Sequence, residues 1–256
     1  MFFTLTIMGT ASAMPISDRN PSAQVLEVHG RLFLLDCGEG TQQQMRRAHL
    51  SFLKVEAVFI THIHGDHVFG LFGLLNTMAM YGRSAPLYVY GPQALGSVLN
   101  FYRSFFGDHD GFEIRFTAVD CAEPQPVHTS KWVRVSAFPL RHRIDCFGYR
   151  IVWLKTGQSA AYCSDTAVFP EEAQWLQGTD LLYHEATFAD EHVDLAHKMF
   201  HSTAREAAEV AAAAGVKKLV IGHFSSRYPD LGLLLSQARE VFPETYLAEE
   251  GKLFEV

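Results

Sequence analysis

The segment FITHIHGDHVFGL, residues 59–71, places three histidines and an aspartate within a few positions of one another. His62, His64, Asp66 and His67 offer imidazole nitrogens and a carboxylate, the donor set that zinc and its neighbouring metals prefer. Four donors packed this tightly cannot all reach one tetrahedral ion without strain, but they can serve two adjacent ions. The alternative is a turn with solvated histidines, and the dense, specific spacing favours metal binding.

Two ions need further ligands from elsewhere in the chain. His142, Asp165 and His223 are the best candidates because each follows an apolar run typical of a strand, and loops at strand ends are where sites are built. A carboxylate such as Asp165 can bridge two cations that would otherwise repel. Two metals roughly 3.5–4 Å apart can share a hydroxide and stabilise both oxygens of a phosphoryl displacement. This pattern predicts a dinuclear hydrolytic centre.

The elements that must position these residues are short strands with helices between some of them. The apolar runs are FFTLTIM, AQVLEV, RLFLLD, AVFITH, PLYVYG, WVRVSAF, GYRIVWL, AAYCSD, DLLYHE and KKLVIGH. The clearest helix is STAREAAEVAAAAGV, with Ser202 or Thr203 as N-cap and Gly215 as its stop. TQQQMRRAH, ALGSVLNFYRSFF and LGLLLSQAREVF are further helical patterns. They predict a mixed-sheet α/β fold with helices outside, and the absence of repeats or linkers predicts one domain over residues 1–256.

Composition limits the partners. The formal net charge is -7, from 28 acidic and 21 basic residues, so the overall balance gives no support to nucleic-acid binding. No apolar run approaches the roughly 20 residues of a membrane span. The start of the chain lacks a basic segment, so we expect no secretory signal. Four cysteines without CxxC spacing are typical of reduced, mostly buried thiols in a cytoplasmic protein.

Several motifs carry a family resemblance. THIHGDH resembles the THxHxDH motif of the metallo-β-lactamase superfamily. Further segments over nearly the whole chain resemble its ribonuclease Z branch: LLDCGEGTQQQM, ITHIHGDHVFGLFGLL, YVYGP, CFGYRI, YCSDT, HEATF, HST and IGHFSSRY. The first motif specifies only the superfamily, whereas HEATF and HST together with GHFSSRY are much more specific. The resemblance implies a four-layer αββα sandwich with two zinc ions at one edge.

The resemblance also implies which side chains hold the ions. The ligands would be His62, His64 and His142 for one ion, Asp66, His67 and His223 for the other, and Asp165 as the bridge. The same nitrogen and oxygen donors accept manganese, and metal availability decides between the two.

Four residues have roles beyond ligation that follow from the same resemblance. Asp66 would also orient the attacking water. His201 of HST would stabilise the transition state or protonate the leaving oxygen, and Glu185 of HEATF would support it. Asp36 would accept a hydrogen bond from a ligating histidine and so fix its tautomer.

Each of these residues has a simpler interpretation. Asp36 could cap the following turn, His142 could lie on a solvated basic edge, His201 could belong only to the start of a helix, and Glu185 could merely end a strand. Other residues near the motifs are expected to be structural or exposed: His184, His192 and His197. We expect Cys163 to be a small buried residue rather than a ligand, because the ligand set is full without it.

Two departures from the ribonuclease Z pattern predict weaker binding of RNA. Ribonuclease Z enzymes usually carry a protruding tRNA-binding arm between the FGYR and SDT strands, but here the interval IVWLKTGQSAAYC allows only a hairpin. The family's PxKxRN loop appears as PISDRN, with Ser17 in place of the lysine. Compensation could come from Arg46, Arg47, Arg83, Arg103, Lys131, Arg141 and Arg143, although scattered solvated charges are the simpler case.

A second subunit could also contribute, because family members are commonly homodimers. The TMAMYG region, with Met78, Met80 and Tyr81, is a candidate interface, and helical core is its alternative.

The sequence therefore predicts a dinuclear zinc phosphodiesterase of ribonuclease Z type. It would hydrolyse a phosphodiester with a metal-bound hydroxide, with the 3′ trailer of precursor tRNA as the candidate substrate. One alternative is the same centre acting on a small or cyclic phosphodiester. A non-catalytic RNA-binding protein is a third hypothesis, against which the complete ligand set argues. β-Lactamase or thioesterase activity fits HEATF and HST less well.

Overall fold

The computed structural model describes residues 2–106 and 111–256, and the chain divides into two compact units. Among the described residues, the first unit comprises 2–9, 13–106, 111–120 and 250–255, and the second comprises 10–12, 121–249 and 256. Each unit is built on its own seven-stranded mixed sheet. The expectation of a single domain over residues 1–256 stays a prediction.

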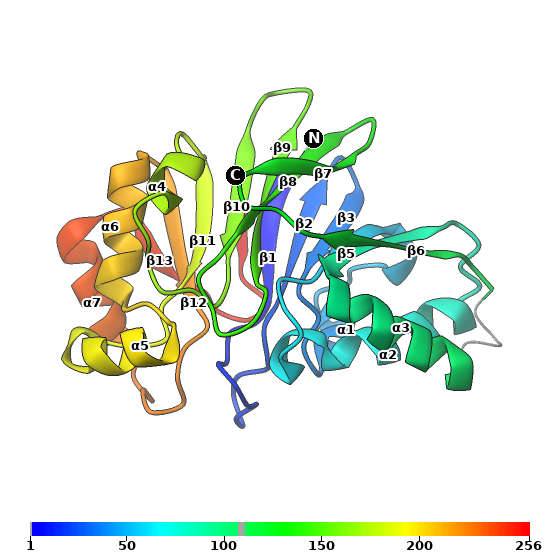
Figure 1. Cartoon of the computed structure of the whole chain (residues 1–256), viewed down its shortest axis with the longest axis horizontal. Coiled ribbons are helices and arrows are strands. Elements are labelled where there is room, and N and C mark those ends of the chain that lie inside the picture. Colours follow the sequence, from blue (N-terminus) through cyan, green and yellow to red (C-terminus); the bar gives the residue numbers. More distant parts are fainter. Residues whose placement is uncertain (1, 107–110) are drawn as a thin grey trace. The chain divides into compact units, whose positions relative to one another are not determined.

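The sheet of the first unit has the strand order β14-β1-β2-β3-β4-β5-β6. Its strands are β1 Phe3–Gly9, β2 Ala23–Val28, β3 Arg31–Leu35, β4 Val55–Phe59, β5 Leu87–Pro92, β6 Ile114–Val119 and β14 Leu253–Glu255. Pairing is antiparallel from β14 to β3 and parallel from β3 to β6. Its helices are α1 Thr41–Arg47, the 3-10 turn Phe52–Lys54, α2 Gly65–Met80 and α3 Gln93–Phe106, and Figure 1 shows α3 lying along β5 and β6.

The sheet of the second unit has the order β13-β12-β11-β10-β9-β8-β7. Its strands are β7 Gln125–Thr129, β8 Val133–Pro139, β9 Phe147–Trp153, β10 Ser159–Cys163, β11 Leu181–Glu185, β12 Lys218–Gly222 and β13 Thr245–Leu247. Pairing is antiparallel from β7 to β10 and parallel from β10 to β13. Its helices are α4 Glu172–Trp175, the 3-10 turn Asp190–His192, α5 Val193–Met199, α6 Ala204–Ala214 and α7 Gly232–Val241, with α6 and α7 packed beside β11 to β13 (Figure 1).

The expected helix and hairpin signals are borne out. Thr203 caps α6 with a reciprocal capping box to Glu206, and Gly215 ends the helix in the left-handed conformation at φ 61°. The interval between β9 and β10 is a tight turn, with Gly157 at φ 79° and its amide bonded to the Trp153 carbonyl. As predicted, the chain has no room for an arm at this position.

The parallel halves of both sheets determine where polar residues gather. Asp36 and His62 follow the carboxyl ends of β3 and β4, and Asp165, Glu185 and His223 lie at or after the carboxyl ends of β10, β11 and β12. Adjacent parallel strands end at the same edge of a sheet, so each unit collects candidate ligands at one edge. None of the helices in the described part of the chain has the length and hydropathy that a membrane span requires.

Candidate metal centre

In the first unit, the histidine-rich motif forms the transition from β4 to α2. His64 is the N-cap residue, with extended backbone at φ -63° and ψ 148°, and the helix begins at Gly65. Asp66 therefore lies in the first helical turn, where the positive end of the helix dipole favours a carboxylate. The Oδ2 atom of Asp66 accepts a hydrogen bond of 2.8 Å from the backbone amide of Ala13.

Asp36 fixes the orientation of this motif by accepting hydrogen bonds from it. Its fully buried carboxylate, on a left-handed backbone at φ 56°, accepts hydrogen bonds from the Thr61 amide at 2.8 Å, the Thr61 hydroxyl at 3.0 Å and His67 Nδ1 at 2.8 Å. Because a carboxylate only accepts, the His67 proton lies on Nδ1 and the Nε2 lone pair points away from Asp36. The expected contact between Asp36 and a candidate ligand histidine is therefore present.

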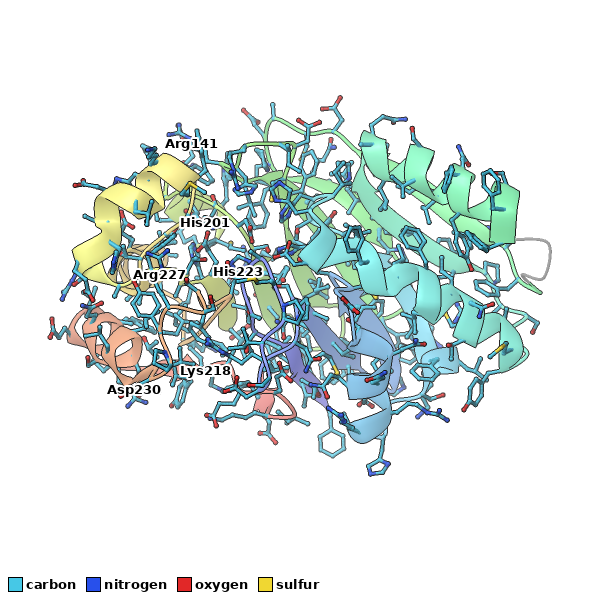
Figure 2. The ribbon with its side chains drawn as sticks, turned by 90° about the horizontal axis from the view of Figure 1, so that it is seen from below. Arg141, His201, Lys218, His223, Arg227 and Asp230 are labelled. Carbon is cyan, nitrogen blue, oxygen red and sulfur yellow. The ribbon has the colours of Figure 1, made fainter. Side chains whose placement is uncertain are left out.

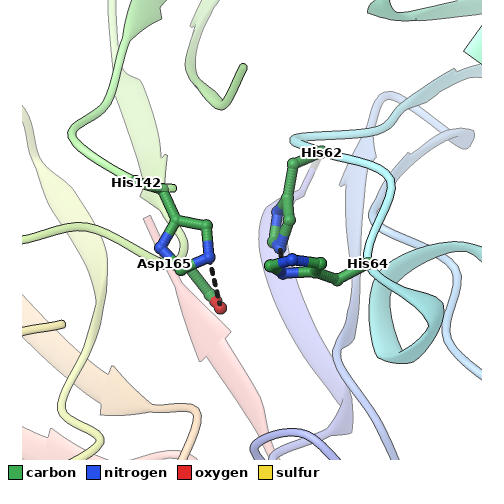
Figure 3. Close-up of side chains that lie close together, drawn as sticks. All are labelled: His62, His64, His142 and Asp165. Carbon is green, nitrogen blue, oxygen red and sulfur yellow. Dashed lines mark hydrogen bonds and ion pairs between the residues drawn. The ribbon is translucent and has the colours of Figure 1, made fainter. Parts of the chain in front are cut away.

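The same network fixes His62. The Thr61 hydroxyl has one proton, and it is donated to Asp36, so its oxygen accepts from His62 Nδ1 at 3.0 Å. His62 therefore presents Nε2, which lies 2.9 Å from Nδ1 of His64 (Figure 3). The lone pair of His67 Nε2 lies 3.4 Å from Asp66 Oδ2. His62 Nε2 and His67 Nε2 each lie beside an atom of a second candidate ligand, so a divalent cation in this position could be bound by both members of each pair.

We predict that Asp36→Ala weakens metal binding about 10- to 100-fold, the usual effect of removing a residue that orients a ligand. It should also lower the free energy of unfolding by about 1–3 kcal/mol, because buried donors lose their acceptor. Competition with a chromogenic chelator measures the first effect and denaturant unfolding the second. The exposed Asp120→Ala variant is the control, and unchanged metal affinity in Asp36→Ala would rule out the positioning role.

In the second unit, two histidines converge on Asp165. His142 Nδ1 donates to the carbonyl of Phe200 at 3.1 Å, which leaves Nε2 facing Asp165 Oδ2 at 3.8 Å (Figure 3). His223, on a left-handed backbone at φ 58°, places Nε2 3.1 Å from Asp165 Oδ1. His223 Nδ1 lies 2.8 Å from the Thr187 hydroxyl, which gives its own proton to Glu185 at 2.6 Å. Both rings therefore present lone pairs to a carboxylate, the arrangement that a bound cation stabilises.

His201 and Glu185 form a buried pair beside Asp165. His201 Nδ1 lies 2.7 Å from Glu185 Oε1, and the fully buried Glu185 also accepts from the amides of Thr166 and Thr187. Burial alone would lower the pKa of His201, but the charge of Glu185 and its hydrogen bond raise it to about 9. Burial likewise opposes ionisation of Glu185, but the positive charge of His201 lowers its pKa. At neutral pH the pair can therefore hold a proton on His201, whose Nε2 lies 4.0 Å from Asp165 Oδ2.

The remaining histidines and Cys163 behave as expected. His184 and Cys163 are fully buried, His192 hydrogen-bonds to the Tyr228 hydroxyl, and the exposed His197 pairs with Glu206. One other candidate is wrong: Arg83 is buried and donates to the carbonyls of Ala85 and Pro86, so it cannot join a basic surface. For Met78, the alternative of helical core is confirmed, because this residue of α2 is fully buried.

Sequence reasoning missed three partners of the candidate ligands: Thr61, Thr187 and the Phe200 carbonyl. Both threonines lie inside quoted motifs, THIHGDH and HEATF. Thr61 directly precedes His62, so its position was a signal, whereas Thr187 is far from His223 in the sequence and only the fold brings them together. The Phe200 carbonyl has no side-chain signal. It is exposed to His142 because Phe200 ends α5 in the left-handed conformation at φ 59°.

Comparison with known proteins gives consistent results. A family model described as a β-lactamase superfamily domain matches residues 31–224. Ribonuclease Z of Bacteroides fragilis is 36% identical over 296 aligned positions, covering 97% of this chain and 97% of that protein. Ribonuclease Z of Parabacteroides distasonis is 37% identical with the same coverage. The crystal structure of human tRNase Z, short form, matches with a TM-score of 0.85 and 32% identity over 98% of each chain.

The alignment to the Bacteroides fragilis protein spans more positions than the 256 residues of this chain. That relative therefore contains segments with no counterpart here. This agrees with the short turn between β9 and β10.

Proposed function

Because the chain belongs to the ribonuclease Z family of the metallo-β-lactamase superfamily, and is thus a metal-dependent endoribonuclease, we propose that it removes the 3′ trailer of precursor tRNA with two zinc ions. The family resemblance and the α/β fold class of αββα metallo-β-lactamase type, both predicted from the sequence, are confirmed by these matches. The number and identity of the metal ions belong to the proposal.

The proposed ligand set keeps the residues predicted from the sequence. One ion would be held by His62, His64 and His142, the other by Asp66, His67 and His223, with Asp165 shared. The observation that supports it most is the tautomer pattern in each unit, where each of four rings has Nδ1 bonded to an oxygen and Nε2 left to bind: His62, His67, His142 and His223. Manganese would suit the same donors.

When bound, divalent cations lower the pKa of water and neutralise charge on a phosphodiester. The chain itself supplies orientation and proton transfer. Asp66, held by the Ala13 amide, would orient the attacking water. As the bond from phosphorus to the 3′ oxygen breaks, His201 would give that oxygen its proton and leave a 3′-hydroxyl on the upstream product, while Glu185 stabilises the imidazolium.

The test incubates zinc-loaded protein and a chelator-treated sample with precursor tRNA bearing a 3′ trailer, and maps the cleavage position. We expect a metal-dependent cut next to the discriminator base. Hydrolysis of a small chromogenic phosphodiester without any cut in tRNA would instead favour the alternative function, a hydrolase of small or cyclic phosphodiesters. The missing arm and the net charge of -7 are the observations that keep this alternative open.

Arg227 is a candidate contact for the RNA backbone. It is exposed, and its guanidinium lies over the ring of Phe188 at 5.2 Å, while that ring lies 6.0 Å from the ring of His201 (Figure 2). A guanidinium held beside the residue that would protonate the leaving oxygen can bind a neighbouring phosphate. The basic candidates Arg141 and Arg143 are also exposed in this unit, and both flank His142.

Arg227→Ala is expected to raise KM for precursor tRNA about tenfold and to reduce the dependence of log KM on log salt by about one unit of slope, as for a lost phosphate contact. Hydrolysis of a small phosphodiester should change little. Arg134→Ala removes another exposed arginine of the same unit and is the control. A loss of equal size on both substrates would place Arg227 in the catalytic machinery and not in the RNA grip.

We also propose that the protein is a homodimer. Large apolar side chains on α2 and α3 are more than half exposed, namely Phe69, Met80, Phe101, Phe105 and Phe106, and Tyr81 beside them is half exposed. An exposed apolar surface of this kind is typical of protein interfaces. Sedimentation should show a dimer for the wild type and a monomer for Phe105→Glu, with Leu154→Glu unchanged. A wild-type monomer at micromolar concentration would exclude this assembly. The cytoplasmic location expected from four cysteines without CxxC spacing stays a prediction.

A further inference from the structure

A second cluster of metal-binding side chains lies in the second unit, beneath α4. Cys163 ends β10, His184 lies on β11, and Glu172 is the first residue of α4. Cys163 and His184 are register partners in the parallel pair, so their side chains leave the sheet on the same face, and Glu172 meets them there. All three side chains are fully buried, and none of them has a part in the proposed catalytic reaction.

The donor atoms of this cluster converge. One atom each from Cys163, Glu172 and His184 lies within 4.8 Å of the others. His184 Nδ1 donates to the backbone carbonyl of Glu185 at 2.7 Å, so Nε2 is the ring nitrogen that faces Glu172 and would bind a metal after giving up its proton. That Nε2 lies 3.1 Å from Glu172 Oε1. A metal-binding histidine usually donates a hydrogen bond from Nδ1 to an oxygen such as a backbone carbonyl and directs Nε2 towards the other metal-binding atoms, as His184 does here.

A second observation also indicates a bound cation. The Oε2 atom of Glu172 is buried and accepts no hydrogen bond from the residues that the structure describes. A buried carboxylate oxygen without a partner is costly, because it loses its hydration and gains nothing in return. A cation beside this oxygen would remove that cost and would use the sulfur, nitrogen and oxygen donors together.

We propose that Cys163, Glu172 and His184 bind a divalent transition metal of the zinc class, at a site separate from the hydrolytic centre. Sulfur, imidazole and carboxylate are zinc's ordinary ligands, and a fourth position would take a small molecule such as water. Because the cluster is fully buried, the ion binds as the chain folds. Its role is structural, since it links β10, β11 and α4 and steadies the backbone of Glu185 through His184.

Metal binding would also change the state of the thiol. A bound zinc-class ion deprotonates a coordinating thiol outright. The sulfur therefore gives the site a spectroscopic signature, because the proposed hydrolytic centre contains only nitrogen and oxygen ligands.

The test replaces zinc by cobalt, by producing the protein in cobalt-containing medium. We expect a near-ultraviolet charge-transfer band from sulfur to cobalt in the wild type, and metal content one ion per chain higher than in Cys163→Ser. Cys37→Ser removes another fully buried cysteine, from the first unit, and should keep the band.

The wild-type spectrum decides the question even if Cys163→Ser fails to fold. Cobalt bound without the sulfur band would overturn the proposal and leave Glu172 and His184 as a hydrogen-bonded pair. This outcome is independent of catalysis, since RNA cleavage does not enter the measurement.

Discussion

Asp66→Ala is expected to abolish hydrolysis, by about 10³-fold or more, and to leave the fold intact. The side chain lies at the positive end of α2, its Oδ2 accepts the Ala13 amide at 2.8 Å and it lies 3.4 Å from His67 Nε2. Removing it takes away a proposed ligand and the group proposed to orient water, and losses of about 10²–10⁴-fold accompany loss of proton-transfer groups alone. Hydrolysis of a small phosphodiester measures the effect without dependence on RNA binding.

The fold should tolerate this change because the rest of the motif is held by Asp36 and Thr61. Loss of the hydrogen bond from the Ala13 amide should cost about 1 kcal/mol or less, because that amide is exposed and water can replace the acceptor. Denaturant unfolding checks this, with Asp120→Ala as an exposed control of the same type. Turnover above one-tenth of the wild-type value in the folded variant would contradict the proposed role.

The parts of this molecule that local chemistry determines could be predicted from the sequence. Helix α6 combines apolar periodicity with a capping threonine and a terminal glycine, and it folds as those signals indicate. The turn between β9 and β10 is short because its residue count allows nothing longer. The THIHGDH spacing places several potential metal ligands within one short segment, independently of how the rest of the chain folds.

What could not be predicted depends on contacts that only the folded chain supplies. Arg83 is typical of a surface residue by type, but it is buried, lies over the ring of Phe112 and donates to the carbonyls of Ala85 and Pro86. The strands β6 and β7 escaped prediction because their apolar residues alternate with exposed polar ones, and β7 contains Pro126. The histidine tautomers follow from Asp36, Thr187 and a helix-ending carbonyl, partners that only the folded chain supplies.

In both units, hydrogen bonds from Nδ1 orient the candidate ligand histidines, but the residues that accept these bonds differ. In each, an oxygen accepts a hydrogen bond from Nδ1 of a histidine and thereby fixes the direction in which Nε2 points. The oxygen belongs to a carboxylate for His67, to a threonine hydroxyl for His62 and His223, and to a backbone carbonyl for His142. Replacing one of these histidines is therefore expected to remove a metal ligand. Replacing the residue that accepts its hydrogen bond is expected only to weaken metal binding. His201 differs because its partner Glu185 is a buried anion that keeps a proton on the ring.

His201→Ala is expected to slow turnover about 10²-fold or more and to spare the bound metal. The ring is held by Glu185 at 2.7 Å, its pKa of about 9 keeps it protonated at neutral pH, and loss of a general acid has this magnitude. Turnover of a small phosphodiester at saturating substrate gives the rate, and elemental analysis gives the metal content. If the metal is lost together with activity, His201 is a ligand and the proposed assignment is wrong.

Glu185→Gln tests whether Glu185 acts only through His201. If Glu185 acts only by keeping His201 charged and oriented, the glutamine variant should lose about 10-fold or more of turnover, and the double variant should be no slower than His201→Ala alone. The Thr166 and Thr187 amides donate to different oxygens of Glu185, and glutamine keeps one accepting oxygen, so it can retain only one of these two bonds. Denaturant unfolding must therefore show that the variant is folded before rates are compared. Losses that multiply in the double variant would mean that Glu185 serves the reaction by a route that does not pass through His201.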